Sequence, residues 1–428
     1  MSWFRNAIRS MASEMKKVPI PRNGVDYRGK IVLAPMVRSG ELPSRLTALH
    51  YGADLVWGPE TVDRSLIGTT RRFNPETKTI EWTRKPSHGT KTPPTDIKDS
   101  LIFRIHPEKE GNKLIFQIGT SNADLAVQAA RLVAADVAGI DVNAGCPKPF
   151  STHDGMGAAL LRTPDKLVGI LEALVQNITP EFEIGISVKI RILETAAETE
   201  VLVRRLVGTG ITGLTVHCRT TPMRPRERAI RGQLRMVADV CHEAGVACLM
   251  NGDVETRDQA LSLIQEYGVD GAMIATQAEK NPSCFRSAAD GGILPWNDVV
   301  EQYIRYALEV ENKFGNTKFL LCQLVPGKQP AYRNISTCKS YTKVCEMLGY
   351  EHLMERAREV DINLDIDLDN AGKKDKKTNN SAFAAGGNMA ESRAKPQTKK
   401  GLAERGVNAQ TEARSAGATP FENIAVPV

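Results

Sequence analysis

The chain has 428 residues, a length that suits a large barrel domain followed by a second, smaller unit. Its composition, 41% hydrophobic and 25% charged, is that of an ordinary globular protein. The sequence contains no run of about 20 consecutive apolar residues, which excludes a membrane-spanning helix, and we expect a soluble protein. The eight cysteines include no C-x-x-C pair. Their spacing argues against structural zinc and disulfides, so we expect no metal site and a reducing compartment.

The net charge of +6 is concentrated in one segment of the chain. From Ala371 to Val428, ten Lys and Arg stand against five Asp and Glu, so the rest of the chain is nearly neutral. A basic surface for nucleic acid on the folded part therefore has to come from local clustering of cations.

The first 24 residues are predicted to be an N-terminal extension. Trp3, Phe4 and Ile8 alternate with Arg5 and Arg9 in a weak amphipathic pattern. A frayed terminal helix explains this pattern, and a mitochondrial presequence is the alternative, because such presequences are rich in Arg and Ser and poor in acids. No secretory signal is visible, and we otherwise expect a cytoplasmic or nuclear protein.

Eight short apolar runs alternate with helical patterns between Ile31 and Ile274. Their apolar character over most of their length is typical of strands that are buried on both faces. Eight strand–helix units predict a TIM-type (β/α)8 barrel domain over residues 25–293 rather than a doubly wound sheet. The predicted strands are Ile31–Ala34, Leu55–Trp57, Leu114–Ile118, Ile140–Asn143, Ile186–Ile190, Gly213–His217, Ala247–Asn251 and Gly271–Ile274.

Capping signals support the helices between these strands. Asn122 is a candidate N-cap, and Thr163 precedes a proline at a first helical position. One connection, Gly58 to Lys113, is much longer than a βα loop requires. Its Thr77–Arg84 and Ser100–His106 stretches predict an inserted hairpin.

The pattern becomes purely helical after Pro295. Trp296–Phe314, Phe319–Leu324 and Cys338–Leu348 predict a small all-helical domain over residues 294–360. The remaining residues, 361–428, are rich in Ala, Gly, Asn, Lys and Gln and nearly free of aromatics. Such a composition cannot bury a core, and it predicts a disordered tail.

Polar or reactive side chains follow almost every predicted barrel strand. In this fold, the carboxyl ends of the strands form the face that carries the active site. The segments at these ends are Ala34-Pro-Met, Gln117, Asn143-Ala-Gly-Cys-Pro, Lys189-Ile-Arg, His217-Cys-Arg, Asn251-Gly-Asp and Ala275-Thr.

Cys146 lies on a loop that Pro147 and Pro149 stiffen. A free thiol titrates near ~8.5, so it is mostly protonated at neutral pH and can act as a general acid. The alternative is a small buried hydrophobic residue. His153, further along, is predicted to be a solvent-facing loop residue.

Lys189 interrupts an apolar strand, and a buried lysine needs an anionic partner or a shifted pKa. It could face the N1/C2 oxygen region of a flavin, form a Schiff base as in aldolases, or make a salt bridge inside the barrel. His217 could hold a cofactor phosphate or ribityl group. The loops after the last two strands often form a phosphate site in this fold, and no G-x-G-x-x-G motif follows a strand. A mononucleotide flavin fits this pattern better than a dinucleotide.

These motifs resemble those of the tRNA-dihydrouridine synthases. The matching segments are Leu33-Ala-Pro-Met-Val, Asp141-Val-Asn-Ala-Gly-Cys-Pro-Lys-Pro, Gly157-Ala-Ala-Leu-Leu, Ser187-Val-Lys-Ile-Arg, Val216-His-Cys-Arg and Asn251-Gly-Asp. The Ala34-Pro-Met-Val-Arg-Ser-Gly segment is similar to the eukaryotic subfamily that modifies uridine 20 of the D-loop.

The resemblance implies FMN as cofactor, NADPH as reductant and tRNA as substrate, with a monomer favoured. It implies that reduced FMN delivers hydride to uracil C6 while Cys146 protonates C5. The implied flavin contacts are Pro35, Met36, Val37, Gln117, Lys189 and His217, and the implied phosphate-end contacts are Asn251, Gly252, Asp253, Ala275 and Thr276. The helical domain would bind the tRNA body through Lys328, Arg333, Lys339 and Lys343, which lie near Tyr332 and Tyr341 in the sequence.

Two departures from the family pattern stand out. Many relatives carry an arginine just after the last strand, where this chain has Ala275-Thr276-Gln277. The phosphate would then depend on backbone amides and a neighbouring cation. Animal members of the subfamily also append a double-stranded-RNA-binding domain, whereas this chain has the predicted disordered tail.

Three other functions remain open from sequence alone. They are an FMN-dependent reductase of the dihydropyrimidine or dihydroorotate type, a Schiff-base aldolase that uses Lys189, and a catalytically silent RNA-binding protein.

Overall fold

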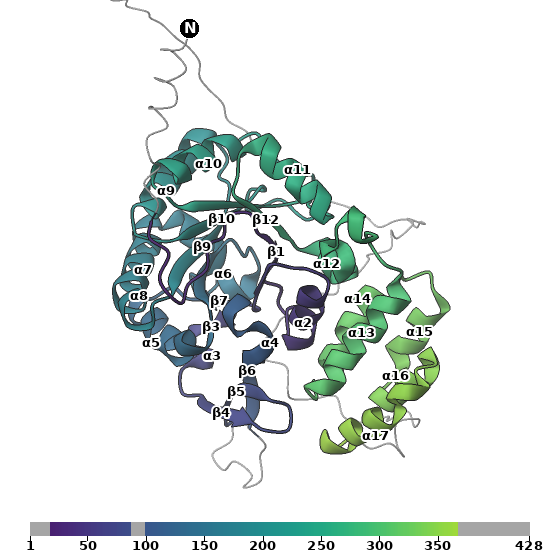
Figure 1. Ribbon diagram of the computed structural model, residues 1–428. Helices are drawn as coiled ribbons and strands as arrows, with labels where there is room; N and C mark the ends of the chain where they lie inside the picture. The colour runs from purple at the N-terminus through teal and green to yellow at the C-terminus, as the bar shows by residue number, and fades with distance from the viewer. Residues whose placement is uncertain (1–17, 87–98, 367–428) are drawn as a thin grey trace, which may run out of the picture. The chain divides into compact units, whose positions relative to one another are not determined.

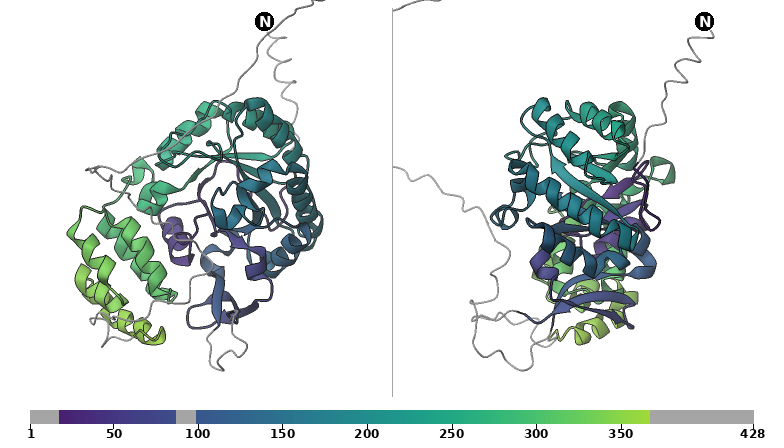
Figure 2. Two further views of the ribbon diagram at one scale, coloured as in Figure 1. Left: turned by 180° about the vertical axis from the view of Figure 1, so that it is seen from behind. Right: turned by 90° about the vertical axis from the view of Figure 1, so that its left-hand side faces the viewer.

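The computed structural model describes residues 18–86 and 99–366. Figure 1 shows a closed barrel of parallel strands surrounded by helices, and Figure 2 shows the same arrangement from behind and from the side. Neighbouring strands pair in parallel around the barrel, and β2 closes it by pairing with β7, so the predicted (β/α)8 fold is confirmed. The barrel strands are β1 (Ile31–Leu33), β2 (Leu55–Trp57), β7 (Leu114–Gly119), β8 (Gly139–Ala144), β9 (Gly185–Arg191), β10 (Gly213–His217), β11 (Ala247–Asn251) and β12 (Gly271–Ile274).

Helices of the barrel domain connect these strands. The N-caps expected from the sequence are present: the Asn122 side chain accepts from the backbone N–H of Leu125, and a proline follows Thr163 at the start of the next long helix. The barrel helices are α2 (Leu42–His50), α3 (Asp63–Leu66), α4 (Pro107–Glu110), α5 (Ala123–Val133), α6 (Pro149–Thr152), α7 (Pro164–Asn177), α8 (Thr179–Phe182), α9 (Ala196–Val207), α10 (Leu234–Glu243), α11 (Arg257–Tyr267) and α12 (Thr276–Lys280).

Alternation along the strands separates the core from the barrel interior. On β8, Ile140 and Val142 belong to the apolar core, while Asp141 bonds to polar side chains of β7 and β9. The register places Asn143 beside Lys189 and His217 beside Asn251. Polar side chains of adjacent strands therefore end at the same level of the barrel.

A tyrosine fills the opposite end of the barrel, where the strands begin. Tyr27 is buried, and its ring packs against Trp57 with the centroids 5.8 Å apart. A Cβ added at Gly213 would lie 2.6 Å from the Tyr27 ring, and one at Gly139 would lie 3.2 Å from its hydroxyl. Glycines at the starts of β8 and β10 thus make the room that this plug occupies.

The long insertion is a three-stranded antiparallel sheet rather than a simple hairpin. It consists of β4 (Thr70–Asn74), β5 (Thr79–Arg84) and β6 (Ser100–Ile105), and the short β3 (Thr61–Val62) adds to β7. The prediction missed β4 because four of its five residues are exposed, so it lacks the alternation of a half-buried strand. Trp82 of β5 is fully buried and its indole N–H donates to the Leu132 carbonyl of α5 at 2.9 Å.

The C-terminal helices have an apolar core of their own, which includes Val299, Tyr303, Leu321 and Tyr341. Two further helices, α15 and α17, escaped the sequence prediction, and α17 extends three residues beyond the expected boundary at 360. None of the helices within the described ranges is long and apolar enough to cross a membrane. The helices are α13 (Trp296–Glu309), α14 (Phe314–Leu324), α15 (Pro330–Thr337), α16 (Tyr341–Leu348) and α17 (Met354–Asn363). The tail predicted to be disordered lies outside the described residues beyond 366.

Candidate active site

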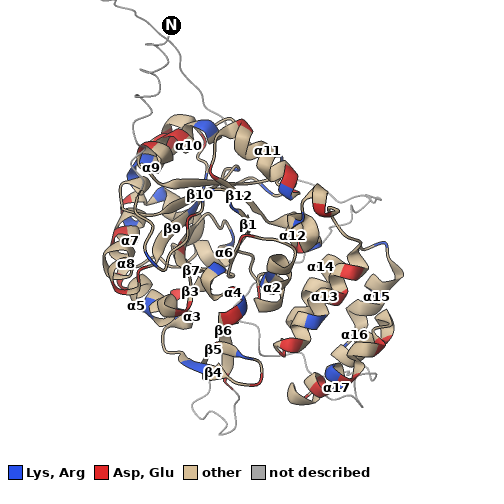
Figure 3. Cartoon of the chain, viewed as in Figure 1, with Lys and Arg blue, Asp and Glu red and all other residues tan. Residues whose placement is uncertain are grey.

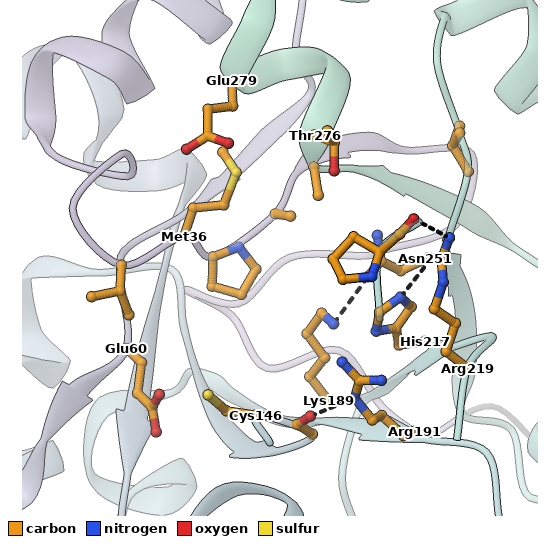
Figure 4. A pocket seen from close by; sticks show the side chains of 18 of the residues that line it. Met36, Glu60, Cys146, Lys189, Arg191, His217, Arg219, Asn251, Thr276 and Glu279 are labelled. Atoms are coloured by element: carbon orange, nitrogen blue, oxygen red, sulfur yellow. Dashed lines mark hydrogen bonds between the residues drawn. The ribbon is translucent and has the colours of Figure 1, made fainter. Parts of the chain in front are cut away.

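A cavity of about 440 Å³ opens at the end of the barrel where the strands finish (Figure 4). Every barrel residue that the sequence singled out for catalysis or cofactor binding lines it. These residues are Pro35, Met36, Val37, Gln117, Cys146, Lys189, His217, Asn251, Gly252, Asp253, Ala275 and Thr276.

The loop that carries Cys146 is held by a dense set of hydrogen bonds. The side-chain oxygen of Asn143 accepts from the backbone N–H of Gly145 at 2.9 Å and of Cys146 at 3.1 Å. Arg191 Nε donates to the Gly145 carbonyl at 2.7 Å. Burial raises the pKa of the Cys146 thiol, and the nearby Glu60 carboxylate raises it further. The thiol is therefore protonated at neutral pH.

Glu60, which the sequence analysis did not select, lies in the same part of the cavity (Figure 4). One carboxyl oxygen accepts from the Ser151 hydroxyl at 3.0 Å. The other is buried without a hydrogen-bond partner among the described residues. Burial raises the pKa of Glu60. The strand-end rule, applied to the segment after β2, was the signal that could have found it.

Lys189 enters the cavity from β9 and is held by an amide rather than a carboxylate. Its Nζ donates to Asn251 Oδ1 at 3.1 Å, and Asn251 Nδ2 donates in turn to the Met273 carbonyl at 3.0 Å. Burial, helped by the charge of Arg191, lowers the pKa of Lys189 to about 8. The ammonium therefore keeps its charge at neutral pH with little to spare.

A buried carboxyl lies beneath this lysine. Asp141 accepts from Gln117 Nε2 at 2.8 Å and from the Ser187 hydroxyl at 2.7 Å, and burial raises its pKa to about 6. Asp141 thereby fixes the amide of Gln117 so that its oxygen and nitrogen have defined orientations.

His217 and Arg219 follow β10 along the cavity wall. Burial, together with Lys189 and two arginines, lowers the pKa of His217 far below its ordinary value, so its ring is neutral. The ring Nε2 lies 3.1 Å from Arg219 Nη1, an arrangement in which the neutral nitrogen accepts and the guanidinium donates. Arg219 also pairs with Asp253. Sequence analysis quoted Arg219 and Arg191 within motifs but gave them no role.

The predicted RNA-binding residues lie elsewhere, on the C-terminal helices and their loops. Lys328 and Arg333 are in the segment 325–337 and Lys339 follows it, while Lys343 on α16 pairs with Glu346 at 2.7 Å. The idea that Tyr341 interleaves with these cations to stack on bases is wrong. Tyr341 is fully buried, and its hydroxyl donates to the Asn312 carbonyl at 2.6 Å.

Residues 32–367 match the family profile described as Dihydrouridine synthase (Dus). The chain belongs to the dihydrouridine synthase family. It is 47% identical over 333 residues to the tRNA-dihydrouridine(20) synthase [NAD(P)+] of Schizosaccharomyces pombe, a match that covers 77% of this chain and 66% of that protein. The Saccharomyces cerevisiae protein of the same name is 45% identical over 331 residues, which cover 76% of this chain and 84% of that protein.

A more distant relative is the mouse tRNA-dihydrouridine(20a/20b) synthase [NAD(P)+]-like protein, which is 28% identical over 64% of this chain and 75% of its own length. Membership of the dihydrouridine synthase family favours a uridine-reducing enzyme over an aldolase or a dihydroorotate-type reductase. Lys189 of this synthase also has an amide partner and a charged ammonium at neutral pH, whereas a Schiff-base lysine has to be neutral to attack a carbonyl.

Proposed function

We propose that this synthase reduces a uridine in the D-loop of tRNA, at position 20, to 5,6-dihydrouridine, with FMN bound in the cavity and NADPH as reductant. The names of the two yeast relatives support the position and the reductant. The observation that carries the proposal is the convergence of a protonated thiol, Cys146, and a partly desolvated cation, Lys189, on one cavity at the barrel mouth.

The residues of this cavity fit a flavin mononucleotide. A volume of about 440 Å³ lies within the range of small-molecule sites. Within the described residues, Lys189 donates one hydrogen bond, to an uncharged oxygen, so the electron-rich N1/C2 edge of a flavin would satisfy its remaining capacity. Gly252 has a φ of +123°, and a Cβ there would lie 3.1 Å from that of Ala229. The absence of a side chain thus keeps this end of the cavity open.

We assign the ring end of the flavin to one set of residues and the phosphate end to another. Arg219 would supply the cation that many relatives place after the last strand, because its guanidinium lines the cavity beside the second set. Bound FMN, once reduced, supplies the hydride that uracil C6 accepts. The ring contacts are Pro35, Met36, Val37, Gln117, Lys189 and His217, and the phosphate-end contacts are Asn251, Gly252, Asp253, Ala275 and Thr276.

Cys146 completes the reaction at the neighbouring carbon. Addition of hydride at C6 leaves negative charge on C5 and O4, so a proton has to reach C5 from a group within hydrogen-bond reach. The Cys146 thiol holds such a proton because its pKa is raised. The hydrogen bonds from the Gly145 and Cys146 amides to Asn143 fix where the sulfur lies.

Two measurements on the purified protein test the proposal. We expect a yellow protein that releases FMN on denaturation, and we expect mass spectrometry to detect dihydrouridine in unmodified tRNA after incubation with NADPH. A tRNA transcript with cytidine at position 20 is the matched control and should gain no dihydrouridine. Release of FAD, or of no flavin from a native preparation, would overturn the cofactor, and dihydrouridine at another position would overturn the assigned site.

A further inference from the structure

The loop between β10 and α10 concentrates positive charge at the barrel mouth. Between Cys218 and Gln233 it carries five arginines and one acidic residue, Glu227. Two of the arginines are structural: Arg219 pairs with Asp253, and Arg231 donates to the carbonyls of Gly252 and Asp253. The other three, Arg224, Arg226 and Arg228, are exposed.

These three side chains have no hydrogen-bond or ion-pair partner in the part of the chain that the structure describes. The single acid of the loop does not neutralise them, because a Glu227 carboxyl oxygen accepts from the backbone N–H of Arg224 at 2.6 Å. Elsewhere, cations and acids are interspersed on the outer helices (Figure 3). Arg204 of α9, for example, pairs with both Glu200 and Glu243.

The loop presents the three arginines from a fixed platform at the edge of the cavity. Arg219 donates from beneath to the carbonyls of Glu227 at 2.7 Å and Pro225 at 3.2 Å. Pro225, between two of the exposed arginines, lines the cavity itself. Arg224 is near enough to contribute to the lowered pKa of Arg191 in the cavity wall.

We infer that Arg224, Arg226 and Arg228 bind the backbone phosphates of the tRNA strand on either side of the uridine in the cavity. The inference rests on the proposed function and names the contact that function requires. Three uncompensated guanidinium groups within five residues suit a polyanion with regularly spaced phosphates. An NADPH molecule occupying the same cavity would offer a single 2′-phosphate to this rim.

The contrast with the C-terminal helices strengthens the assignment. There, Lys343 is already paired with Glu346. The arginine loop, by comparison, places its free charges next to the reacting base. It therefore fixes the position of the uridine strand, while contacts further away hold the body of the tRNA.

The test compares the binding of unmodified tRNA by three full-length proteins as salt is varied. Arg224→Ala/Arg226→Ala/Arg228→Ala should lose on the order of tenfold or more in affinity, and its plot of log affinity against log salt should become shallower by about two to three, roughly one per phosphate contact. Arg72→Ala/Arg162→Ala/Arg358→Ala removes the same charge from exposed arginines that do not line the cavity. This control should keep the wild-type slope.

Replacing the three loop arginines with lysine should restore most of the salt dependence, because phosphates respond to charge. An unchanged slope in the alanine variant would overturn the inference. So would slower flavin reduction by NADPH in that variant, with tRNA binding intact, which would assign the loop to the dinucleotide. Because binding is measured without turnover, a wild-type protein that forms no dihydrouridine would refute the proposed function alone.

Discussion

At the residue scale, Cys146 depends on its surroundings for its proton. Most activated cysteines sit beside cations that lower the thiol pKa and create a nucleophilic thiolate. Here burial and the Glu60 carboxylate raise the pKa and outweigh Lys148 and Arg191, which act in the opposite direction. The site is therefore built to keep a thiol, which suits proton donation and opposes covalent attack.

Cys146→Ala should abolish most dihydrouridine formation while leaving the fold, the bound flavin and its reduction by NADPH unchanged. General acids contribute ~10²–10⁴-fold to a rate, so we expect a loss of that size. The measurement is the amount of dihydrouridine formed on unmodified tRNA, by mass spectrometry. Cys322→Ala is the matched control, since Cys322 is also partly exposed but does not line the cavity. Equal rates for Cys146→Ala and the control would exclude this thiol as the acid.

Lys189 should make flavin affinity depend on pH. Its pKa is about 8 without a ligand, so the ammonium that attracts an electron-rich ligand is lost as pH rises through 8. Fluorescence titration of the apoprotein with FMN should therefore show affinity falling between pH 7 and 9, with uptake of protons on binding at the higher pH. Lys189→Arg should bind with no such dependence, and Lys189→Met should bind weakly throughout. A pH profile for Lys189→Met that matched the wild type would contradict this role.

Which site residues the sequence could predict follows from where each lies. Cys146, Lys189 and His217 end barrel strands, and the strand pattern alone brings such positions to one face. Glu60 was missed because the segment after β2 looked like the start of an insertion. Arg219 stood in a noted motif, but its role needs the three-dimensional pairing with Asp253. Tyr341 was misassigned because an aromatic among lysines in a sequence does not reveal that it points into the core.

At the scale of elements, a buried ion pair ties the insertion to the cavity. Arg45 of α2 donates to Glu110 of α4 at 2.8 and 2.6 Å, and both side chains are buried. Arg45 also donates to the Gly40 carbonyl at 2.9 Å, and the Gly40 N–H donates to the Met36 carbonyl at 2.7 Å. The loop that lines the cavity after β1 is thus anchored through α2 to α4.

Glu110→Ala should lower the free energy of unfolding by ~3–5 kcal/mol, because it leaves the Arg45 guanidinium buried without its counter-charge. Urea unfolding measures this loss. Arg45→Met/Glu110→Leu should recover most of the stability, since it removes both charges and keeps the volume. The double variant should nevertheless bind FMN more weakly, because the Gly40 carbonyl loses its donor. Restored affinity in that variant would show that the loop after β1 does not need this anchor.

The elements themselves were largely predictable, for a physical reason. All eight barrel strands are buried on both faces, which produces continuous apolar runs in the sequence. The exposed β4 carries no such run, and α15 and α17 bury too few residues to give a clear helical stripe. Prediction from sequence thus succeeded where burial determined the residues and failed where it did not.

At the scale of the whole molecule, two apolar cores are joined by polar contacts. Arg104 of the inserted sheet donates to the Val310 carbonyl and to the Asn312 side chain, and Asn312 donates to Glu41 ahead of α2. Most of the net charge lies outside both cores, beyond residue 366.

A chain truncated after residue 366 should reduce its flavin with NADPH at the full rate. The removed segment contains few apolar residues and none of the residues that line the cavity. Its loss should weaken tRNA binding only at low salt, where distant charges still act. Stopped-flow absorbance of the flavin checks the first expectation, and tRNA binding at two salt concentrations checks the second. Loss of NADPH oxidation on truncation would show that the segment serves the chemistry.

The tyrosine that closes the bottom of the barrel has a kinetic consequence. Because Tyr27 fills the space between the strand starts, the cavity has one doorway, at the end that carries Cys146. The nicotinamide and the uracil both have to approach the flavin through that doorway, so they visit in turn. Oxidised dinucleotide must depart before the nucleic acid enters. Initial rates measured at several fixed tRNA concentrations should therefore give parallel lines in double-reciprocal plots against NADPH, the signature of a ping-pong cycle.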